Sequence, residues 1–164
     1  MAFNVPPLRI SGIVAESIVD GPGFRYVIFT QGCPHGCPGC HNPQTHDFSG
    51  GQEIDPLSLL LEIDENPLLA GVTFSGGEPF CQSEALLCLA EAIKARGLHL
   101  LIYSGYTYEQ LLALCEETPA VGRLLSLCDT LIDGPYIEAQ RDLTLLFRGS
   151  ANQQILQLKN GHPV

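Results

Sequence analysis

The chain has 164 residues, 45% of them hydrophobic, which suffices for one globular core and leaves no room for a second enzyme domain. Its 8 Lys and Arg stand against 18 Asp and Glu, and a net charge of −10 excludes the general basic surface of a nucleic-acid-binding protein. The apolar runs are shorter than the ~20 residues that span a bilayer and no signal peptide begins the chain, so we expect a single domain over residues 1–164, in the cytoplasm, with no nucleic acid and no membrane as partner.

The first half of the chain predicts short strands and one short helix. The stretch before Gly21 predicts one or two short strands, and the β-branched and aromatic run at 24–30 predicts a strand that leads into a loop rich in Cys, Pro and Gly. A helix is expected from Asp55 to about Asp64, because Asp55 is a good N-cap and the proline after it suits the first helical position.

The second half alternates strands and helices. Residues 71–74 predict a strand that ends in a Ser-Gly-Gly-Glu-Pro turn. Apolar residues at helical spacing predict a helix over 83–96, with Ser83 as its N-cap and Gly97 as its stop. The further elements expected are a strand at 98–103, a helix at 108–117, a strand at 130–132 and a late edge strand at 153–158.

Near-continuous apolar strands separated by helices predict an α/β fold with a mostly parallel sheet. A closed barrel needs eight units of ~30 residues, so an open, partial (β/α) barrel is favoured. Ligands bind at the carboxyl edge of parallel strands, where glycine turns let the backbone approach them. We therefore expect one pocket lined by the turns that hold Gly32, Gly76 with Gly77, Gly105 and Gly134.

Three cysteines, Cys33, Cys37 and Cys40, follow the first of these strands in C-x3-C-x2-C spacing. They are predicted metal ligands that supply three thiolates and no fourth, so a [4Fe-4S] cube held by them keeps one iron free of protein ligands. The alternative is a structural zinc site completed by an imidazole, for which the candidates are His35, His41 and His46. The other cysteines, Cys81, Cys88, Cys115 and Cys128, lack ligand spacing and are expected to pack as small hydrophobes.

The cysteine spacing, together with the turn Ser75 to Pro79 after a later strand, resembles the radical S-adenosylmethionine enzymes. The resemblance implies an open barrel of that type, in which the free iron is chelated by the amine and carboxylate of S-adenosyl-L-methionine. It also implies that Gly76, Gly77 and Glu78 hold the methionine end. Gly39, Cys40 and His41 would lie on the adenine side by position. Ser104 and Asp133 are expected to border the same pocket, although serine and aspartate are also common in plain turns.

Within that superfamily the chain resembles the activating enzymes of anaerobic (class III) ribonucleoside-triphosphate reductases. The segments that carry the resemblance are 20–25, 32–43, 103–106, 133–136 and 147–153, while Gln154 and His46 depart from the usual arginine and tryptophan. The resemblance implies that a flavodoxin-type donor reduces the cluster. S-adenosylmethionine is then cleaved to methionine and a 5'-deoxyadenosyl radical, which takes a hydrogen atom from a glycine of the reductase.

Several alternatives stay open at this point. The target can be another glycyl-radical enzyme of the pyruvate formate-lyase type, or the chain can be a non-catalytic metal-binding or redox-sensing module. His35 is expected to be exposed. Arg25, Arg141 and Arg148 either form a local basic patch for a partner or make ordinary solvated ion pairs.

Overall fold

The computed structural model describes residues 5–164, in which eight strands form one sheet in the order β3-β1-β2-β4-β5-β6-β7-β8. The strands are β1 (Leu8–Ser17), β2 (Phe24–Thr30), β3 (Gln52–Ile54), β4 (Leu69–Gly76), β5 (His99–Tyr103), β6 (Thr130–Asp133), β7 (Gln154–Lys159) and β8 (His162–Pro163). The pairs β2–β4, β4–β5 and β5–β6 are parallel, and the outer pairs are antiparallel. The predicted α/β class, with an open sheet that is parallel at its centre, is confirmed.

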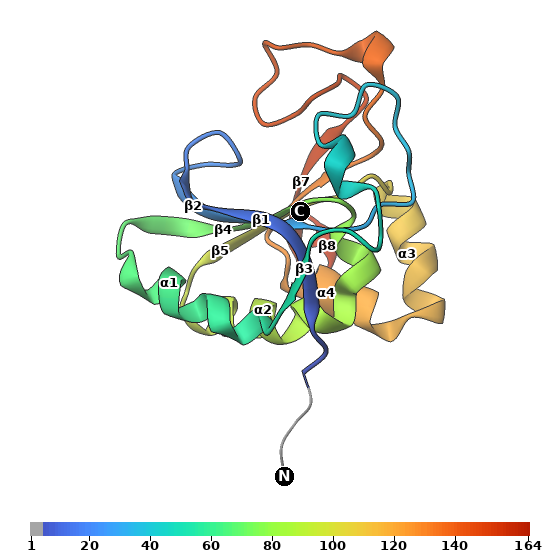
Figure 1. The fold of residues 1–164 in the computed structure, drawn as a ribbon. Coiled ribbons are helices and arrows are strands. Elements are labelled where there is room, and N and C mark those ends of the chain that lie inside the picture. The colour runs from blue at the N-terminus through green and yellow to red at the C-terminus, as the bar shows by residue number, and fades with distance from the viewer. Residues whose placement is uncertain (1–4) are drawn as a thin grey trace.

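The α-helices lie on one side of this sheet, and the long loops after β2 and β6 rise on the other side (Figure 1). The helices are α1 (Leu60–Glu65), α2 (Ser83–Ala95), α3 (Tyr108–Glu117) and α4 (Pro119–Leu127). Helix α4 and strand β3 were not predicted, and the late edge strand is β7, which pairs with β6 on one side and β8 on the other. Within residues 5–164, no helix has the length and apolarity needed to cross a membrane.

The helix starts follow local capping chemistry. Asp55 accepts a hydrogen bond from the backbone N–H of Leu57 at the start of the 3-10 turn η2 (Pro56–Leu59), as its N-cap role predicts. Ser83 is not the N-cap of α2: Gln82 holds that position, because a 3-10 turn, η3 (Pro79–Gln82), precedes the helix and is capped by Glu78. Gly97 takes a φ of +73° just after α2, which suits a glycine stop.

The apolar core lies between the helices and one face of the sheet. Because side chains alternate along a strand, every second residue of β4, β5 and β6 points toward the helices. The buried core residues of these strands and of α2 and α4 include Val72, Phe74, Leu100, Ile102, Leu131, Leu86, Leu89, Ile93, Leu124 and Leu125. This packing fixes the positions of the strand ends that carry the site.

A fully buried arginine holds the opposite face of the sheet at its amino-terminal end. Arg25 on β2 donates to Thr73 Oγ1 at 2.7 Å, to the Val72 carbonyl at 2.9 Å and to the Pro22 carbonyl at 3.0 Å. It also meets His99 Nδ1 at 3.0 Å. Burial lowers the pKa of Arg25 to about 10, so the guanidinium stays charged near neutral pH. Arg25 therefore belongs to the interior and not to a surface basic patch.

The arginine sets the proton positions of a chain of hydrogen bonds across four strands. A guanidinium only donates, so His99 Nδ1 must accept and its proton must sit on Nε2. That Nε2 lies 3.0 Å from Thr130 Oγ1, and Thr130 in turn donates to Gln157 Oε1 at 2.8 Å. Burial, followed by the charge of Arg25, lowers the pKa of His99, which keeps the ring neutral.

Replacing this arginine should destabilise the fold strongly. Arg25→Met leaves buried carbonyls and the His99 ring without their donor, and we expect a loss of at least ~3 kcal/mol in the free energy of unfolding, measured with urea. The matched control is Arg123→Met, which breaks a solvent-exposed pair with Glu91 and should cost less than ~1 kcal/mol. Equal costs for the two variants would contradict this role of Arg25.

The stability should also fall in acid because of His99. A histidine whose pKa is lowered in the folded state takes up a proton more readily when the chain unfolds. Its contribution is therefore present above about pH 6.5, the unfolded pKa, and is lost as the pH falls below that value. His99→Gln should flatten the decline in unfolding free energy as the pH falls below about 6.5. The other histidines are common to both proteins, so parallel curves would show that His99 contributes nothing.

Candidate functional site

A cavity of about 380 Å³ lies at the carboxyl-terminal edge of the parallel strands. Its lining comes from the cysteine loop after β2 and from the turns after β4, β5 and β6. The loop before β2 and the segment after β6 complete the wall. The lining residues are Val19, Asp20, Phe29, Cys33, His35, Cys37, Cys40, His41, Asn42, Ser75, Gly76, Gly77, Tyr103, Ser104, Gly105, Gly134, Tyr136, Leu145, Phe147, Arg148, Gly149 and Gln153. All four glycine turns expected to meet in one pocket contribute lining residues, although the turn after β2 does so through Cys33 and not through Gly32 itself.

The cysteine loop folds back on itself before the chain returns to the sheet. The backbone N–H of Gly32 donates to the Thr45 carbonyl at 2.7 Å, and that of Cys33 donates to the His46 carbonyl at 3.2 Å. The amide of Gln31 ties the base of the loop by donating to the carbonyls of Gln44 and Asp47. The loop is therefore held at both ends while its middle faces the cavity.

Cys33, Cys37 and Cys40 are half-buried, form no disulfide and all line the cavity. Burial raises the pKa of the Cys33 thiol, and the negative charges of Glu78 and the other two cysteines add to the rise. A bound metal reverses that effect, since a coordinating thiol loses its proton. The soft sulfur donors fit an iron-sulfur cluster.

A structural zinc site is the alternative for these three cysteines. Zinc needs four donors around one ion, with sulfur at about 2.3 Å. Among residues 5–164, no three His, Cys, Asp or Glu side chains converge to hold a single ion. An iron-sulfur cube does not need such convergence, because each cysteine binds a different iron.

A buried carboxylate, Glu78, connects the cysteine loop to the ends of β4 and β5. Glu78 is 0% exposed, and its oxygens accept from Ser104 Oγ at 2.9 and 3.0 Å and from the Gly105 N–H at 2.8 Å. They also accept from the Phe80 N–H at 3.1 Å and lie 2.6 Å from His35 Nε2. The carboxylate is thus committed to donors of the protein and lies behind the cavity wall.

The expectation that His35 is exposed is wrong. Its side chain is 15% exposed, pairs with Glu78, and packs edge-on against the Tyr106 ring with 4.5 Å between ring centroids. It also lies over Gly105, where a Cβ would come within 2.3 Å of the imidazole. Residue 105 must therefore be glycine for His35 to reach Glu78.

The two glycines after β4 allow a close approach of backbone to backbone. A Cβ on Gly76, whose φ is +94°, would lie 2.5 Å from the Thr30 nitrogen, and one on Gly77 would lie 2.4 Å from the Gly32 carbonyl oxygen. The backbone N–H of Gly77 donates to the Thr30 carbonyl, and the backbone N–H of Glu78 donates to the Gly32 carbonyl. The turn is thus fastened to the start of the cysteine loop, with both glycines in the cavity wall.

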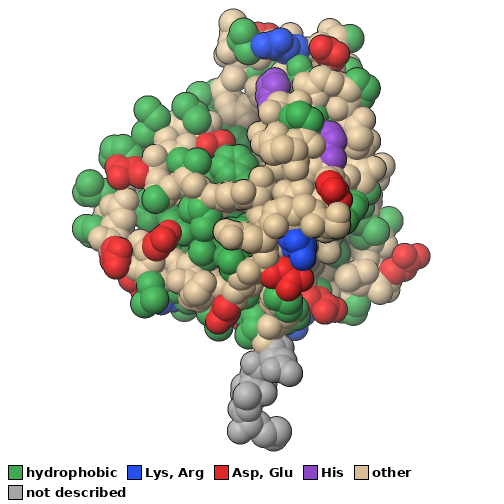
Figure 2. All heavy atoms as spheres, in the orientation of Figure 1, with side chains coloured by type: hydrophobic (Ala, Val, Ile, Leu, Met, Phe, Trp, Pro, Cys, Tyr) green, Lys and Arg blue, Asp and Glu red, His purple; other side chains and the backbone are tan. Residues whose placement is uncertain are grey.

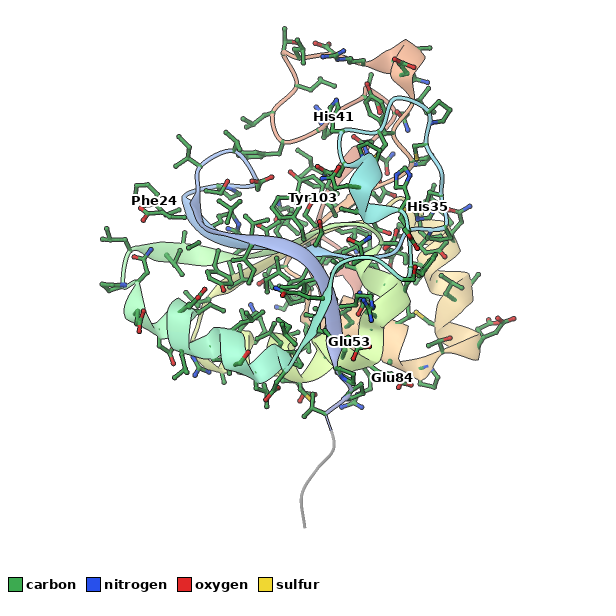
Figure 3. The ribbon with its side chains drawn as sticks, viewed as in Figure 1. Phe24, His35, His41, Glu53, Glu84 and Tyr103 are labelled. Carbon is green, nitrogen blue, oxygen red and sulfur yellow. The ribbon has the colours of Figure 1, made fainter. Side chains whose placement is uncertain are left out.

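The other residues predicted to border the pocket differ in whether they line the cavity. Ser104 lines the cavity, while its hydroxyl is used by Glu78. His41 lines the cavity on the cysteine loop and packs against Tyr136, with 5.0 Å between ring centroids. Gly39 packs against the Glu138 carboxylate. Asp133 is not in the lining: its carboxylate accepts from the N–H groups of Tyr108 and Gln154. Figure 3 shows Tyr103 on the side of the sheet that faces the loop carrying His35 and His41.

Sequence reasoning did not assign the lining residues Phe29, Tyr103 and Phe147 to the site, although Tyr103 and Phe147 lie in segments that carry the family resemblance. Phe29 and Tyr103 are outer residues of their strands, and for Phe29 only the period-2 position could have indicated the cavity. The arginines do not form a patch: Arg25 is buried, Arg141 is exposed and Arg148 lines the cavity. The face shown in Figure 2 likewise carries no broad basic area.

The comparison with known proteins gives a consistent family. Residues 19–156 match the family model described as a 4Fe-4S single cluster domain. The anaerobic ribonucleoside-triphosphate reductase-activating protein of Salmonella typhi is 30% identical over 87% of this chain and 94% of its own length. The protein of that name from Vibrio cholerae is 34% identical over 84% of this chain and 90% of its own length.

The pyruvate formate-lyase-activating enzyme of Clostridium pasteurianum is 39% identical over 69% of this chain, but this match spans only 50% of the enzyme. The crystal structure of QueE from Escherichia coli aligns with a TM-score of 0.49 at 21% identity, over 62% of this chain and 54% of QueE, a likeness too distant to bear on function. The two reductase-activating proteins, in contrast, match over 90% or more of their own length. The chain therefore belongs to the 4Fe-4S single cluster domain family and, within it, to the anaerobic ribonucleoside-triphosphate reductase-activating proteins.

Proposed function

We propose that this chain activates an anaerobic ribonucleoside-triphosphate reductase by placing a glycyl radical on it, through reductive cleavage of S-adenosylmethionine at a [4Fe-4S] cluster. Support comes from the relatives named anaerobic ribonucleoside-triphosphate reductase-activating protein, which match this chain over nearly their whole length. The observation that carries the proposal is the joining of three thiols and the Gly76–Gly77 turn in one cavity of nucleoside size.

The proposed ligands of the cluster are Cys33, Cys37 and Cys40. When bound, the cluster supplies one-electron chemistry and an iron with an open coordination position. The chain's own residues bind and orient the ligand. The carbonyls of Gly76 and Gly77 are proposed acceptors for the methionine ammonium, because Glu78 already has its donors within the protein. Gly39 and His41 are proposed to lie beside the adenine.

Glu78 and Ser104 are proposed to act by position. They fix the glycine turn and the cysteine loop relative to each other, and a bound cofactor gains from such pre-arranged contacts because little ordering remains to be done. The last cysteine of the loop, Cys40, and the first glycine of the turn, Gly76, are 36 positions apart in sequence. Because both are held by the same buried carboxylate, the cysteine loop and the glycine turn keep a fixed position relative to each other.

The proposed partner is the glycyl-radical subunit of the reductase, with a flavodoxin-type protein as electron donor and the cytoplasm as location. The reductase is favoured over a formate-lyase because the chain spans nearly the whole of the reductase-activating proteins and half of the formate-lyase-activating enzyme. We further propose that residues 1–164 act as one domain, since all the described strands belong to one sheet.

The cysteine assignment can be tested by removing each thiol. Cys33→Ser, Cys37→Ser and Cys40→Ser should each reduce cluster content by about tenfold or more after anaerobic reconstitution, because three ligands are the minimum for such a cluster. Iron, acid-labile sulfide and visible absorption measure this directly. Cys88→Ser, on helix α2 away from the cavity, is the control and should keep its cluster. A variant of the three that retains full iron would remove that cysteine from the ligand set.

The reaction is tested with the cluster-loaded protein. After reduction and addition of S-adenosylmethionine, 5'-deoxyadenosine should form, and a glycyl signal should appear in electron paramagnetic resonance when the reductase is present. A formate-lyase offered in parallel should give no signal. Release of no 5'-deoxyadenosine would favour the alternative of a non-catalytic redox module.

A further inference from the structure

Arg148 enters the wall of the cavity with an unused hydrogen-bond donor. Its Nε is buried and has no partner, and its Nη1 donates to the Gln153 carbonyl at 3.1 Å. None of the ion pairs among residues 5–164 includes Arg148. A buried donor without a partner is costly, and because Arg148 lines the cavity, a ligand bound there is the natural source of the missing acceptor.

The backbone around Arg148 holds it in place. Phe147, the residue before it, has a φ of +61°, a conformation that costs a side-chain-bearing residue ~1 kcal/mol or more. Tyr103 stabilises that turn by donating to the Phe147 carbonyl at 2.7 Å. Gln153 accepts from the N–H groups of Gly149 and Ser150. The guanidinium therefore projects from a fixed turn and not from a free loop.

The charges in the cavity favour an anion at this position. Arg148 is the only Lys or Arg among the lining residues, and Asp20 is the only Asp or Glu. Asp20 already accepts from Ser17 Oγ at 2.6 Å. The acid nearest in sequence, Asp142, accepts from the N–H and hydroxyl of Thr144. The hydrogen bonds from Thr144 and, to a smaller degree, the charge of Arg148 lower the pKa of Asp142. Neither Asp142 nor Asp20 forms an ion pair with the guanidinium.

We propose that Arg148 binds the carboxylate of S-adenosylmethionine. The inference rests on the proposed function, in which that molecule occupies the cavity. Its carboxylate is its only anionic group, since the ammonium and the sulfonium are both cationic. A guanidinium matches the shape of a carboxylate with two parallel N–H donors, and Nε is one of the atoms that make such pairs.

The test compares two ligands and two arginines. Cluster-loaded, unreduced protein is titrated under anaerobic conditions with S-adenosylmethionine and with its decarboxylated analogue, and the dissociation constants are measured by equilibrium dialysis. Arg148→Gln removes the charge, and Arg148→Lys keeps it without the planar fork. Arg141→Gln, on the same segment but outside the lining, is the matched control. Iron content and melting temperature confirm that each variant is folded and loaded.

Arg148→Gln should weaken S-adenosylmethionine on the order of 10- to 100-fold, the effect of one charged hydrogen-bonded contact. The decarboxylated analogue should change less than about twofold, because it lacks the group that the arginine holds. Arg148→Lys should lie between, and Arg141→Gln should match the wild type. The melting temperature should change little, since the substitution removes an unsatisfied donor along with the single hydrogen bond to the Gln153 carbonyl.

Equal losses for the two ligands would overturn the inference, because they would indicate a general effect on the cavity. Unchanged affinity of Arg148→Gln for S-adenosylmethionine would overturn it as well, while leaving the proposed function intact. If the wild-type protein binds no S-adenosylmethionine at all, the proposed function itself fails, and this inference fails with it.

Discussion

The arrangement of the site depends on one buried carboxylate. Glu78 has no solvent contact, yet it receives the hydroxyl of Ser104, two backbone N–H groups and the imidazole of His35. Burying a carboxylate is unfavourable unless its oxygens are satisfied by such donors. Because these donors come from three segments, the carboxylate stays buried only when the cysteine loop and the ends of β4 and β5 are all in place. The same glutamate that the family resemblance assigns to the ligand thus organises the wall around it.

The sheet face opposite the helices carries a hydrogen-bonded network at one end of its strands and the cavity at the other end. At the amino-terminal ends of the strands, Arg25 and His99 form a closed polar network in which donors and acceptors are matched across β2, β4, β5 and β6. At the carboxyl-terminal ends, the outer residues Phe29, Ser75 and Tyr103 open onto the cavity. The closed end is consistent with a stable scaffold, whereas at the open end Arg148 lines the cavity and its buried Nε has no partner among the described residues. The outward-facing residues of the same strands therefore contribute to the stability of the fold at one end and line the cavity at the other.

The sequence pattern predicted the features that depend on interactions between residues close together in the chain. The strand at 24–30 agrees with β2, the helix at 108–117 with α3, and Asp55 and Gly97 act at helix ends as their chemistry requires. The three cysteines share one cavity because they lie in one short loop. The failures involve distant partners: His35 pairs with Glu78, 43 positions away, and the buried Arg25 donates to Thr73, 48 positions away. No local pattern encodes such contacts, and the two-residue strand β8 and three-residue strand β3 exist only because a neighbouring strand pairs with them.

The central claim is that Glu78 holds the cysteine loop and the two strand ends as one unit. Hydrogen exchange of backbone amides in the wild type and in Glu78→Gln, followed by mass spectrometry, tests it most directly, because an amide side chain cannot accept from all four donors at once. We predict faster exchange together in peptides that cover 31–46, 77–82 and 104–106, with helix α2 unchanged. Faster exchange confined to the Phe80 and Gly105 amides, with the cysteine loop as protected as before, would contradict the claim.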